Sequence, residues 1–310
     1  MKPAISVIIC THNPRRNYLD KVLSALQAQT LLLEKWEIIL VDNASKQVLS
    51  SEIDLGWHPQ SRHIREETLG LTPARLRGIK EAAADTLVFV DDDNVLDSDY
   101  LEVALRISKD YPFIGAWGGQ IKGEFEVPPP DWTQPYWEYL GIREFDQDKW
   151  SSLLHQHDTT PCGAGMCVRK MVADKYSNLV KNDSRRLHLG RQGLDTQAQI
   201  LFSCEDTDLA FTACDVGLGT GQFKDLKMTH LIPASRLEEE YLVKLVEGII
   251  YSHKILDSFR GLLPTIVTIR WKDQLFRYYR LCKMNPIERR FYQAIIRGEA
   301  LARQKILESQ

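Results

Sequence analysis

The chain lacks several features that would assign it to a particular class of protein. Its six cysteines show no CxxC spacing, so a zinc cluster is not expected. Several of them lie in apolar runs, where a free thiol packs as a small core residue. The longest apolar run near the C-terminal end, Gly261 to Ile269, is too short to span a bilayer. No leader sequence is apparent, so the reducing cytoplasm is the expected location.

No strong excess of either charge is present. The formal net charge is −3 at pH 7, so the overall charge gives no reason to expect nucleic-acid binding. The basic residues are concentrated at the end, where ten Lys or Arg accompany four Asp or Glu from Arg270 onward. Within this region, Trp271 to Met284 places aromatic, leucine and basic residues at helical spacing. The segment predicts peripheral contact with the inner face of the cell membrane or, slightly favoured, a helix packed on the protein or a partner subunit.

Apolar segments alternate with helix-period segments through the first 117 residues. The expected buried strands are Ala4 to Cys10, Trp36 to Val41, Thr86 to Val90 and Phe113 to Trp117. The expected helices are about Tyr18 to Gln29, Thr72 to Ala84 and Asp99 to Lys109, with Thr72 as N-cap and Pro73 at the first helical position. This alternation predicts an α/β fold with an open, mostly parallel sheet flanked by helices.

The pattern changes in the middle of the chain. The segment 124–160 contains three consecutive prolines from Pro128 and three tryptophans, and a regular strand cannot run through such a proline cluster. We expect an irregular insertion with an aromatic surface. Beyond Lys170 the pattern is mainly helical and includes Thr207 to Val216 and Glu238 to Ser258. We therefore expect one domain at residues 1–235 and a helical C-terminal extension at residues 236–310.

Three of the expected strands end in polar residues. The polar segments are Thr11 to Asn13, Asp42 to Ser45 and Asp91 to Asn94. Ligands bind beyond the carboxyl ends of the strands in open α/β sheets, so the three segments should face one crevice. The consecutive carboxylates of the third segment need a neutralising charge, which a hard divalent cation with phosphate oxygens supplies. A solvated acidic loop is the alternative, and the position at a strand end disfavours it.

The third segment fits two classes of enzyme. VFVDDDNVL matches the DxDx(V/T) pattern of haloacid-dehalogenase-like phosphohydrolases, in which Asp91 would attack phosphate and Asp93 would act as acid and base. The wider sequence resembles the family-2 glycosyltransferases of the GT-A fold from about Ile5 to Ile232. The motifs that carry this resemblance are, in order, SVIICTHNPRR, ILVDNAS, GLTPARLRGIKEA, VFVDDDNVLDSDYL, CGAGMCVRK and CEDTDLAF. A phosphohydrolase would not be expected to carry the upstream DNAS or the downstream ED.

The resemblance implies a Rossmann-like GT-A domain and a role for each motif. The residues that would bind the nucleotide sugar are Thr11, Asn13, Asp42, Arg75, Asp91 and Asp92. Those that would hold Mn²⁺ or Mg²⁺ are Asp93, Asp91 and His230. The catalytic residues would be Asp206, as general base, and Glu205, while Gly163, Gly165 and Trp132 would lie on the acceptor side. Leu76 stands where the family usually has asparagine, so contacts of that asparagine are not expected.

Each of these residue types also has a purely structural explanation. Asn and Asp favour strand-ending turns, glycines allow tight turns, and acidic residues favour the first turn of a helix. Tryptophans such as Trp132 more often pack in a core than stack on sugar rings. His230 is as consistent with a strand-end histidine bonded to the backbone as with a metal ligand, and Arg236 is as consistent with a surface cation as with a diphosphate contact.

The leading hypothesis is an inverting sugar transfer. The donor would be a nucleoside-diphosphate sugar, with a UDP-sugar favoured, and the acceptor a hydroxyl of a glycan or of a lipid-linked saccharide. A divalent ion would stabilise the leaving diphosphate, and Asp206 would take the proton of the attacking hydroxyl. A protein that binds nucleotide sugars without turnover is the non-enzymatic alternative, and the intact DDD and ED motifs count against it. The sequence leaves the oligomeric state open.

Overall fold

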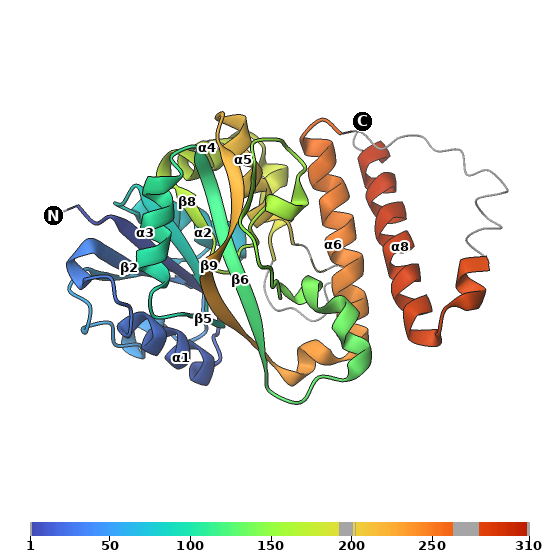
Figure 1. The fold of residues 1–310 in the computed structure, drawn as a ribbon, viewed down its shortest axis with the longest axis horizontal. Coiled ribbons are helices and arrows are strands. Elements are labelled where there is room, and N and C mark those ends of the chain that lie inside the picture. Colours follow the sequence, from blue (N-terminus) through green and yellow to red (C-terminus); the bar gives the residue numbers. More distant parts are fainter. Residues whose placement is uncertain (1, 192–200, 202, 263–278, 309–310) are drawn as a thin grey trace.

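A nine-stranded sheet forms the centre of the part of the chain that the structure describes, with helices on both faces (Figure 1). The computed structural model describes residues 2–191, 201, 203–262 and 279–308. The strands follow the order β3-β2-β1-β4-β8-β6-β9-β5, and β7 pairs with β9. The predicted α/β class is confirmed.

The first half of the sheet is parallel and buried. Its strands are β1 (Ile5–Thr11), β2 (Trp36–Asn43), β3 (Ser61–Glu66) and β4 (Thr86–Asp91). β1 lies between β2 and β4, and every residue of β1 and β2 is buried. Burial on both faces explains why these strands are continuous apolar runs rather than alternating ones. The register places Thr11 beside Asp42 and Cys10 beside Asp91, so the polar strand ends meet at one edge.

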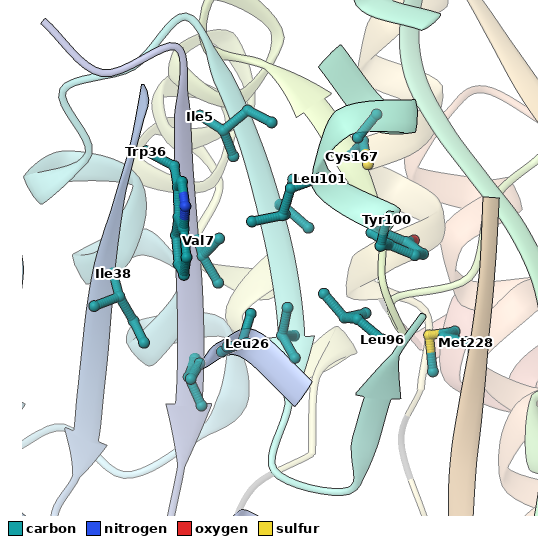
Figure 2. Close-up of a cluster of buried hydrophobic side chains, with 14 of the residues drawn as sticks. Ile5, Val7, Leu26, Trp36, Ile38, Leu96, Tyr100, Leu101, Cys167 and Met228 are labelled. Carbon is teal, nitrogen blue, oxygen red and sulfur yellow. The ribbon is translucent and has the colours of Figure 1, made fainter. Parts of the chain in front are cut away.

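Two layers of helices cover the sheet. One face packs against α1 (Arg16–Gln27) and α3 (Tyr100–Asp110), and the other against α2 (Leu71–Glu81), α4 (Lys170–Asn182) and α5 (Glu205–Asp215). Successive side chains of β1 point to opposite faces, so Val7 joins the first core cluster and Ile8 the second. Figure 2 shows the first cluster, in which Leu26 of α1 and Leu101 of α3 cover Val7.

The second half of the sheet is mixed. Its strands are β5 (Asn94–Leu96), β6 (Ile114–Phe125), β7 (Lys149–Ser151), β8 (Cys167–Arg169) and β9 (Gly219–Ile232). β6 and β9 run parallel to each other, while β8 is antiparallel to β4 and β6. The sequence prediction of a mainly helical region beyond Lys170 is wrong for β9, and β6 is longer than expected. Glycines within these strands interrupt the apolar pattern by which a strand is predicted from sequence. Gly119 is needed because the chains approach closely there: a Cβ atom on Gly119 would lie 1.8 Å from the Leu226 carbonyl oxygen.

The start of α2 also differs from the prediction. The helix begins at Leu71 with Gly70 as its N-cap, so Thr72 is not the cap and Pro73 is the third helical residue. Gly70 has a φ of 137°, which side-chain-bearing residues rarely adopt. Its N–H donates to Asn43 Oδ1 at 2.8 Å. The end of β2 therefore fixes where α2 begins.

The C-terminal helices pack on the predicted irregular insertion. α6 (Glu239–Phe259) and α8 (Pro286–Glu308) lie side by side (Figure 1) and enclose a third core cluster. The 3₁₀ helix η3 (Asp131–Leu140) of the insertion closes this cluster, which includes its half-buried Trp132 and Trp137. The domain boundary at residue 235 stays a prediction.

The predicted membrane contact concerns a segment that the structure covers in part. Of Trp271 to Met284, residues 271–278 lie outside the described residues. Within the described ranges, no helix combines the length and the apolar character that crossing a membrane requires. Peripheral contact through the basic segment remains a proposal.

We predict that Phe291→Ala destabilises the protein by about 3–5 kcal/mol, because it leaves a cavity in the third core cluster. Phe291 is 1% exposed and stacks on Tyr136 with ring centroids 3.5 Å apart. The matched control is Phe113→Ala, since Phe113 is 44% exposed and should lose about 1 kcal/mol or less. Chemical denaturation followed by circular dichroism measures both, and equal losses would contradict the packing of α8.

Candidate active site

The polar ends of β1, β2 and β4 form one connected network. The Thr11 hydroxyl donates to Asp92 Oδ2, which links the first strand end to the third. The Asn13 N–H donates to Ser45 Oγ at 2.9 Å, and the Lys46 N–H donates to Asn13 Oδ1 at 2.9 Å. Asn13 has a φ of 48°, a left-handed conformation that asparagine tolerates in turns. The three polar segments thus meet at one edge of the sheet, and the crevice expected there stays a prediction.

Asp42 is buried, and both of its carboxylate oxygens accept hydrogen bonds from the protein. Its carboxylate accepts hydrogen bonds from the Ser45 N–H at 3.0 Å, the Leu49 N–H at 3.2 Å and Arg65 Nη1 at 2.7 Å. Burial acts to raise the pKa of Asp42, but these donors outweigh it and lower the pKa below its ordinary value. Asp42 therefore shapes the loop after β2, and its contact with a nucleoside base stays a prediction.

Arg75 is a buried cation that joins the acidic strand end to α5. Its Nη2 lies 3.4 Å from Asp91 Oδ1, and its Nη1 lies 3.1 Å from Glu205 Oε1. The side chain is 3% exposed and its guanidinium lies over the Phe89 ring. Gly163 makes room for it, because a Cβ atom there would lie 2.6 Å from Arg75 Nη2. One guanidinium thus brings the DDD and ED motifs into one site.

The two acidic residues at the start of α5 point to different partners, as expected for adjacent helical positions. Asp206 Oδ2 accepts a hydrogen bond from the Gly163 N–H at 2.6 Å, and its Oδ1 accepts from the Thr207 N–H at 2.7 Å. Asp206 remains partly exposed, whereas Glu205 is buried against Arg75. Burial raises the pKa of Glu205 to about 7 against the opposing charge of Arg75, and the Asp206 carboxylate adds to the rise.

The consecutive aspartates have contrasting environments. Burial and the charge of Asp93 raise the pKa of Asp92 to about 7, although the Thr11 hydroxyl opposes the rise. Burial also acts on Asp93, but the side chains of His230 and Arg236 outweigh it and hold the pKa of Asp93 well below its usual range. Asp93 Oδ2 lies 3.3 Å from His230 Nε2 and 3.1 Å from Arg236 Nη2. Asp93 is therefore the charged member of the pair.

His230 has the hydrogen bonding that a metal-binding histidine requires. Its Nδ1 lies 2.9 Å from the Leu140 carbonyl oxygen, which only accepts, so Nδ1 donates this hydrogen bond, and Arg236 Nη1, which only donates, lies 3.0 Å from Nε2. Metal-binding histidines are commonly oriented by such a bond to a backbone carbonyl. Nε2 points at Asp93. These two residues therefore fit a divalent ion.

The described part of the chain holds no group of three or more His, Cys, Asp or Glu side chains arranged to bind a metal by themselves. Asp91, a predicted ligand, pairs with Arg75 in this structure. Mg²⁺ usually takes only one or two carboxylates, together with waters and phosphate oxygens of the substrate. The donor set formed by Asp93 and His230 matches an ion that arrives with a diphosphate.

The predicted acceptor-side residues are found in two places. Gly163 and Gly165 lie in the turn before β8, where Gly165 has a φ of 69° and its carbonyl accepts a hydrogen bond from the Tyr100 hydroxyl at 2.5 Å. Trp132 instead packs beside Phe291, with ring centroids 6.3 Å apart. This position favours a packing role for Trp132, and its contact with an acceptor stays a prediction.

Sequence reasoning missed two residues that hold the site in place. Asn43 donates to the carbonyl oxygens of Glu66 and Thr68, besides accepting from Gly70, and so ties β2 to α2. Arg65 neutralises Asp42 from β3, a strand that was not predicted. Asn43 stands within the ILVDNAS motif, which could have identified it. Arg65 gave no comparable signal.

The sequence of the chain is similar to those of known glycosyltransferases. The model of the family described as "Glycosyl transferase family 2" matches residues 6–175. Polypeptide N-acetylgalactosaminyltransferase 8 of Drosophila melanogaster is 36% identical over 104 residues, which cover 32% of this chain and 18% of that protein. Glycosyltransferase AglE of Haloferax volcanii is 30% identical over 103 residues, which cover 32% of this chain and 34% of that protein. The matches thus span about a third or less of these relatives' own length.

The fold has solved counterparts as well. The crystal structure of S. aureus TarS 1-349 in complex with UDP-GlcNAc superposes with a TM-score of 0.54 at 14% sequence identity. The match covers 99% of this chain and 83% of that chain. At this identity the likeness concerns the fold alone, and it agrees with the predicted GT-A architecture.

We predict that stability falls as the pH rises from about 4.5 to about 7, and that Glu205→Gln removes this part of the dependence. The folded protein holds a proton on Glu205 that the unfolded chain releases near the ordinary pKa of 4.5. Denaturation midpoints measured from pH 4.5 to 8 report the slope. Glu240→Gln, at a side chain that is 79% exposed, is the control and should keep the wild-type slope. An unchanged slope in Glu205→Gln would contradict the raised pKa.

Proposed function

The chain belongs to glycosyl transferase family 2, and from this premise we propose that it transfers a sugar from a nucleoside-diphosphate sugar, favourably a UDP-sugar, to a hydroxyl group. The acceptor would be a glycan or a lipid-linked saccharide. The observation that carries the proposal is the position of Arg75, whose guanidinium contacts Asp91 on one side and Glu205 on the other. Arg75 thus brings the acidic end of β4, where the donor would bind, close to the start of α5, which carries the proposed base.

The donor would lie across the ends of β1, β2 and β4. The nucleoside would contact Thr11, Asn13 and Asp42, and the ribose and diphosphate would lie against Asp91 and Asp92. The complex of S. aureus TarS 1-349 with UDP-GlcNAc supports a uridine donor by analogy of fold. Arg75 would keep Asp91 oriented, since its guanidinium stays charged in a protein.

Asp93 and His230 would hold Mn²⁺ or Mg²⁺ through Oδ2 and Nε2. When bound, the ion would act as a Lewis acid on the diphosphate leaving group. The chain's own contribution would be to present one carboxylate oxygen from Asp93, the residue directly before β5, and one imidazole nitrogen from β9, because the register places Asn94 opposite His230. Arg236 would supply a further positive charge beside the diphosphate.

Asp206 would act as the general base. Its Oδ2 is held by the Gly163 N–H and its side chain is partly exposed, so it can reach an acceptor hydroxyl. A carboxylate held by backbone donors is oriented without being neutralised by a cation. Direct displacement by the deprotonating hydroxyl, from the face opposite the leaving group, would invert the anomeric centre. Glu205 would support the site through Arg75 rather than exchange roles with Asp206.

The alternatives predict different behaviour. A phosphohydrolase would release phosphate from simple monoesters without a sugar nucleotide, and the family match over residues 6–175 counts against it. A binding protein without turnover would bind the nucleotide and leave the sugar in place. The two acidic motifs in contact through Arg75 favour an active enzyme over this alternative.

We expect one of UDP, GDP and dTDP, with UDP favoured, to bind in calorimetry and to bind more tightly with Mn²⁺ present. The reason is that Asp93 and His230 leave ligand positions for a diphosphate to complete. The selected nucleotide then defines which sugar nucleotides to assay for release of nucleoside diphosphate. Absence of binding for all three, with metal present, would overturn the proposed donor.

We predict that Asp206→Asn lowers turnover of the selected sugar nucleotide by about 10²–10⁴-fold, because a general base contributes about that much. Nucleotide affinity should stay within about twofold of wild type, since Asp206 contacts the acceptor side. The matched control is Asp225→Asn, whose side chain is 57% exposed on β9 and which should keep wild-type turnover. Unchanged turnover in Asp206→Asn would remove Asp206 as the base.

A further inference from the structure

Arg236 contacts both of the atoms that would bind a metal ion. Its Nη2 lies 3.1 Å from Asp93 Oδ2, and its Nη1 lies 3.0 Å from His230 Nε2. Asp93 Oδ2 and His230 Nε2 are themselves 3.3 Å apart. A single guanidinium therefore satisfies both donor atoms at once.

The distance between Asp93 Oδ2 and His230 Nε2 is close to the distance that would let both atoms bind one metal ion. Metal–ligand distances of about 2.0–2.1 Å place two adjacent ligands of an octahedral ion about 3 Å apart. The observed separation of 3.3 Å needs only a small adjustment. The guanidinium and a divalent ion cannot both hold these atoms, because each needs the same electron pair of His230 Nε2 and the two cations repel each other.

We propose that Arg236 is an internal counter-ion that holds the metal position in the donor-free protein and moves onto the diphosphate when metal and donor bind. This inference rests on the proposed function, and it concerns how the binding of the metal ion is coupled to the binding of the nucleotide sugar. It assigns Arg236 two alternative partners, the Asp93–His230 pair and the diphosphate. A surface cation would have neither.

The exchange makes metal and nucleotide bind cooperatively. Without nucleotide, a metal ion would have to break the contacts of Arg236 with Asp93 and His230 and leave the guanidinium without a new partner. With nucleotide, the diphosphate completes the coordination of the ion and also accepts the displaced guanidinium, which can bind phosphate oxygens bidentately. Because such coupling is reciprocal, the metal must increase nucleotide affinity by the same factor.

The position of Arg236 in the fold permits this movement. It lies in η6 (Ala234–Leu237), a single turn of 3₁₀ helix between β9 and α6. Its side chain is 21% exposed. Leu237, the next residue, is buried in the third core cluster and anchors the turn. The long side chain can therefore change partners by rotation about its own bonds while the backbone stays in place.

The test is the affinity for Mn²⁺ with and without saturating UDP, measured on the full chain from the loss of the free Mn²⁺ signal in electron paramagnetic resonance. Arg236→Gln should bind Mn²⁺ about tenfold more tightly than wild type in the absence of UDP, because a charge-assisted contact no longer competes. The factor by which UDP strengthens Mn²⁺ binding should shrink in the same variant. Arg236→Lys should lie between the two, since an ammonium cannot contact both atoms in the same way.

Arg106→Gln is the matched control, because Arg106 is half-exposed and its partner is Asp225, which is not one of the proposed site residues. It removes the same charge and should leave both Mn²⁺ affinities unchanged, which separates a local contact from a general change in potential. Unchanged or weaker Mn²⁺ binding by UDP-free Arg236→Gln would overturn the inference, while metal-dependent UDP binding by wild type would still support the donor site. Failure of wild type to bind any of UDP, GDP and dTDP, with or without Mn²⁺, would instead overturn the proposed function.

Discussion

The buried ion pairs of Arg75 are the interaction on which the site depends. A guanidinium that is 3% exposed is costly unless carboxylates surround it, and Asp91 and Glu205 supply that compensation from β4 and α5. Glu205 is 130 residues further along the chain than Arg75, so the contact forms only when the sheet and both helices are in place. Gly163 is required in the same place, since any side chain there would meet the guanidinium. The requirement for a buried cation thus constrains four segments of the chain at once.

The balance of charge explains why the acidic strand end is stable without a ligand. Asp91 faces Arg75 and Asp93 faces Arg236, so each of the outer carboxylates has a cation, while Asp92, between them, accepts a hydrogen bond from the Thr11 hydroxyl. The raised pKa of Asp92 follows from this arrangement, because burial and the charge of Asp93 favour its protonated form. Three neighbouring carboxylates can therefore bind a further cation. The side chains suited to bind it are Asp93 and His230.

Much of this site could be predicted from the sequence because short motifs at strand ends encode it. Strands β1, β2 and β4 were identifiable as apolar runs, and their parallel pairing follows from the helices between them. β9 was not identifiable, since glycines and charged residues interrupt GTGQFKDLKMTHLI and its partner β6 lies about a hundred residues earlier. The packing partner of Trp132 was not identifiable for a similar reason, because Phe291 lies in α8, far along the chain. Long-range packing decided both.

The C-terminal helices act on the site through η3. Leu140, the last residue of η3, is buried in the third core cluster beside Leu242 of α6 and Phe291 of α8. Its carbonyl oxygen accepts a hydrogen bond from His230 Nδ1, and this bond orients the ring so that Nε2 faces Asp93. If α6 and α8 did not hold η3, the imidazole would lose the bond that sets its tautomer and orientation. The extension therefore helps to build the site, because its packing fixes one of the two side chains suited to a metal ion.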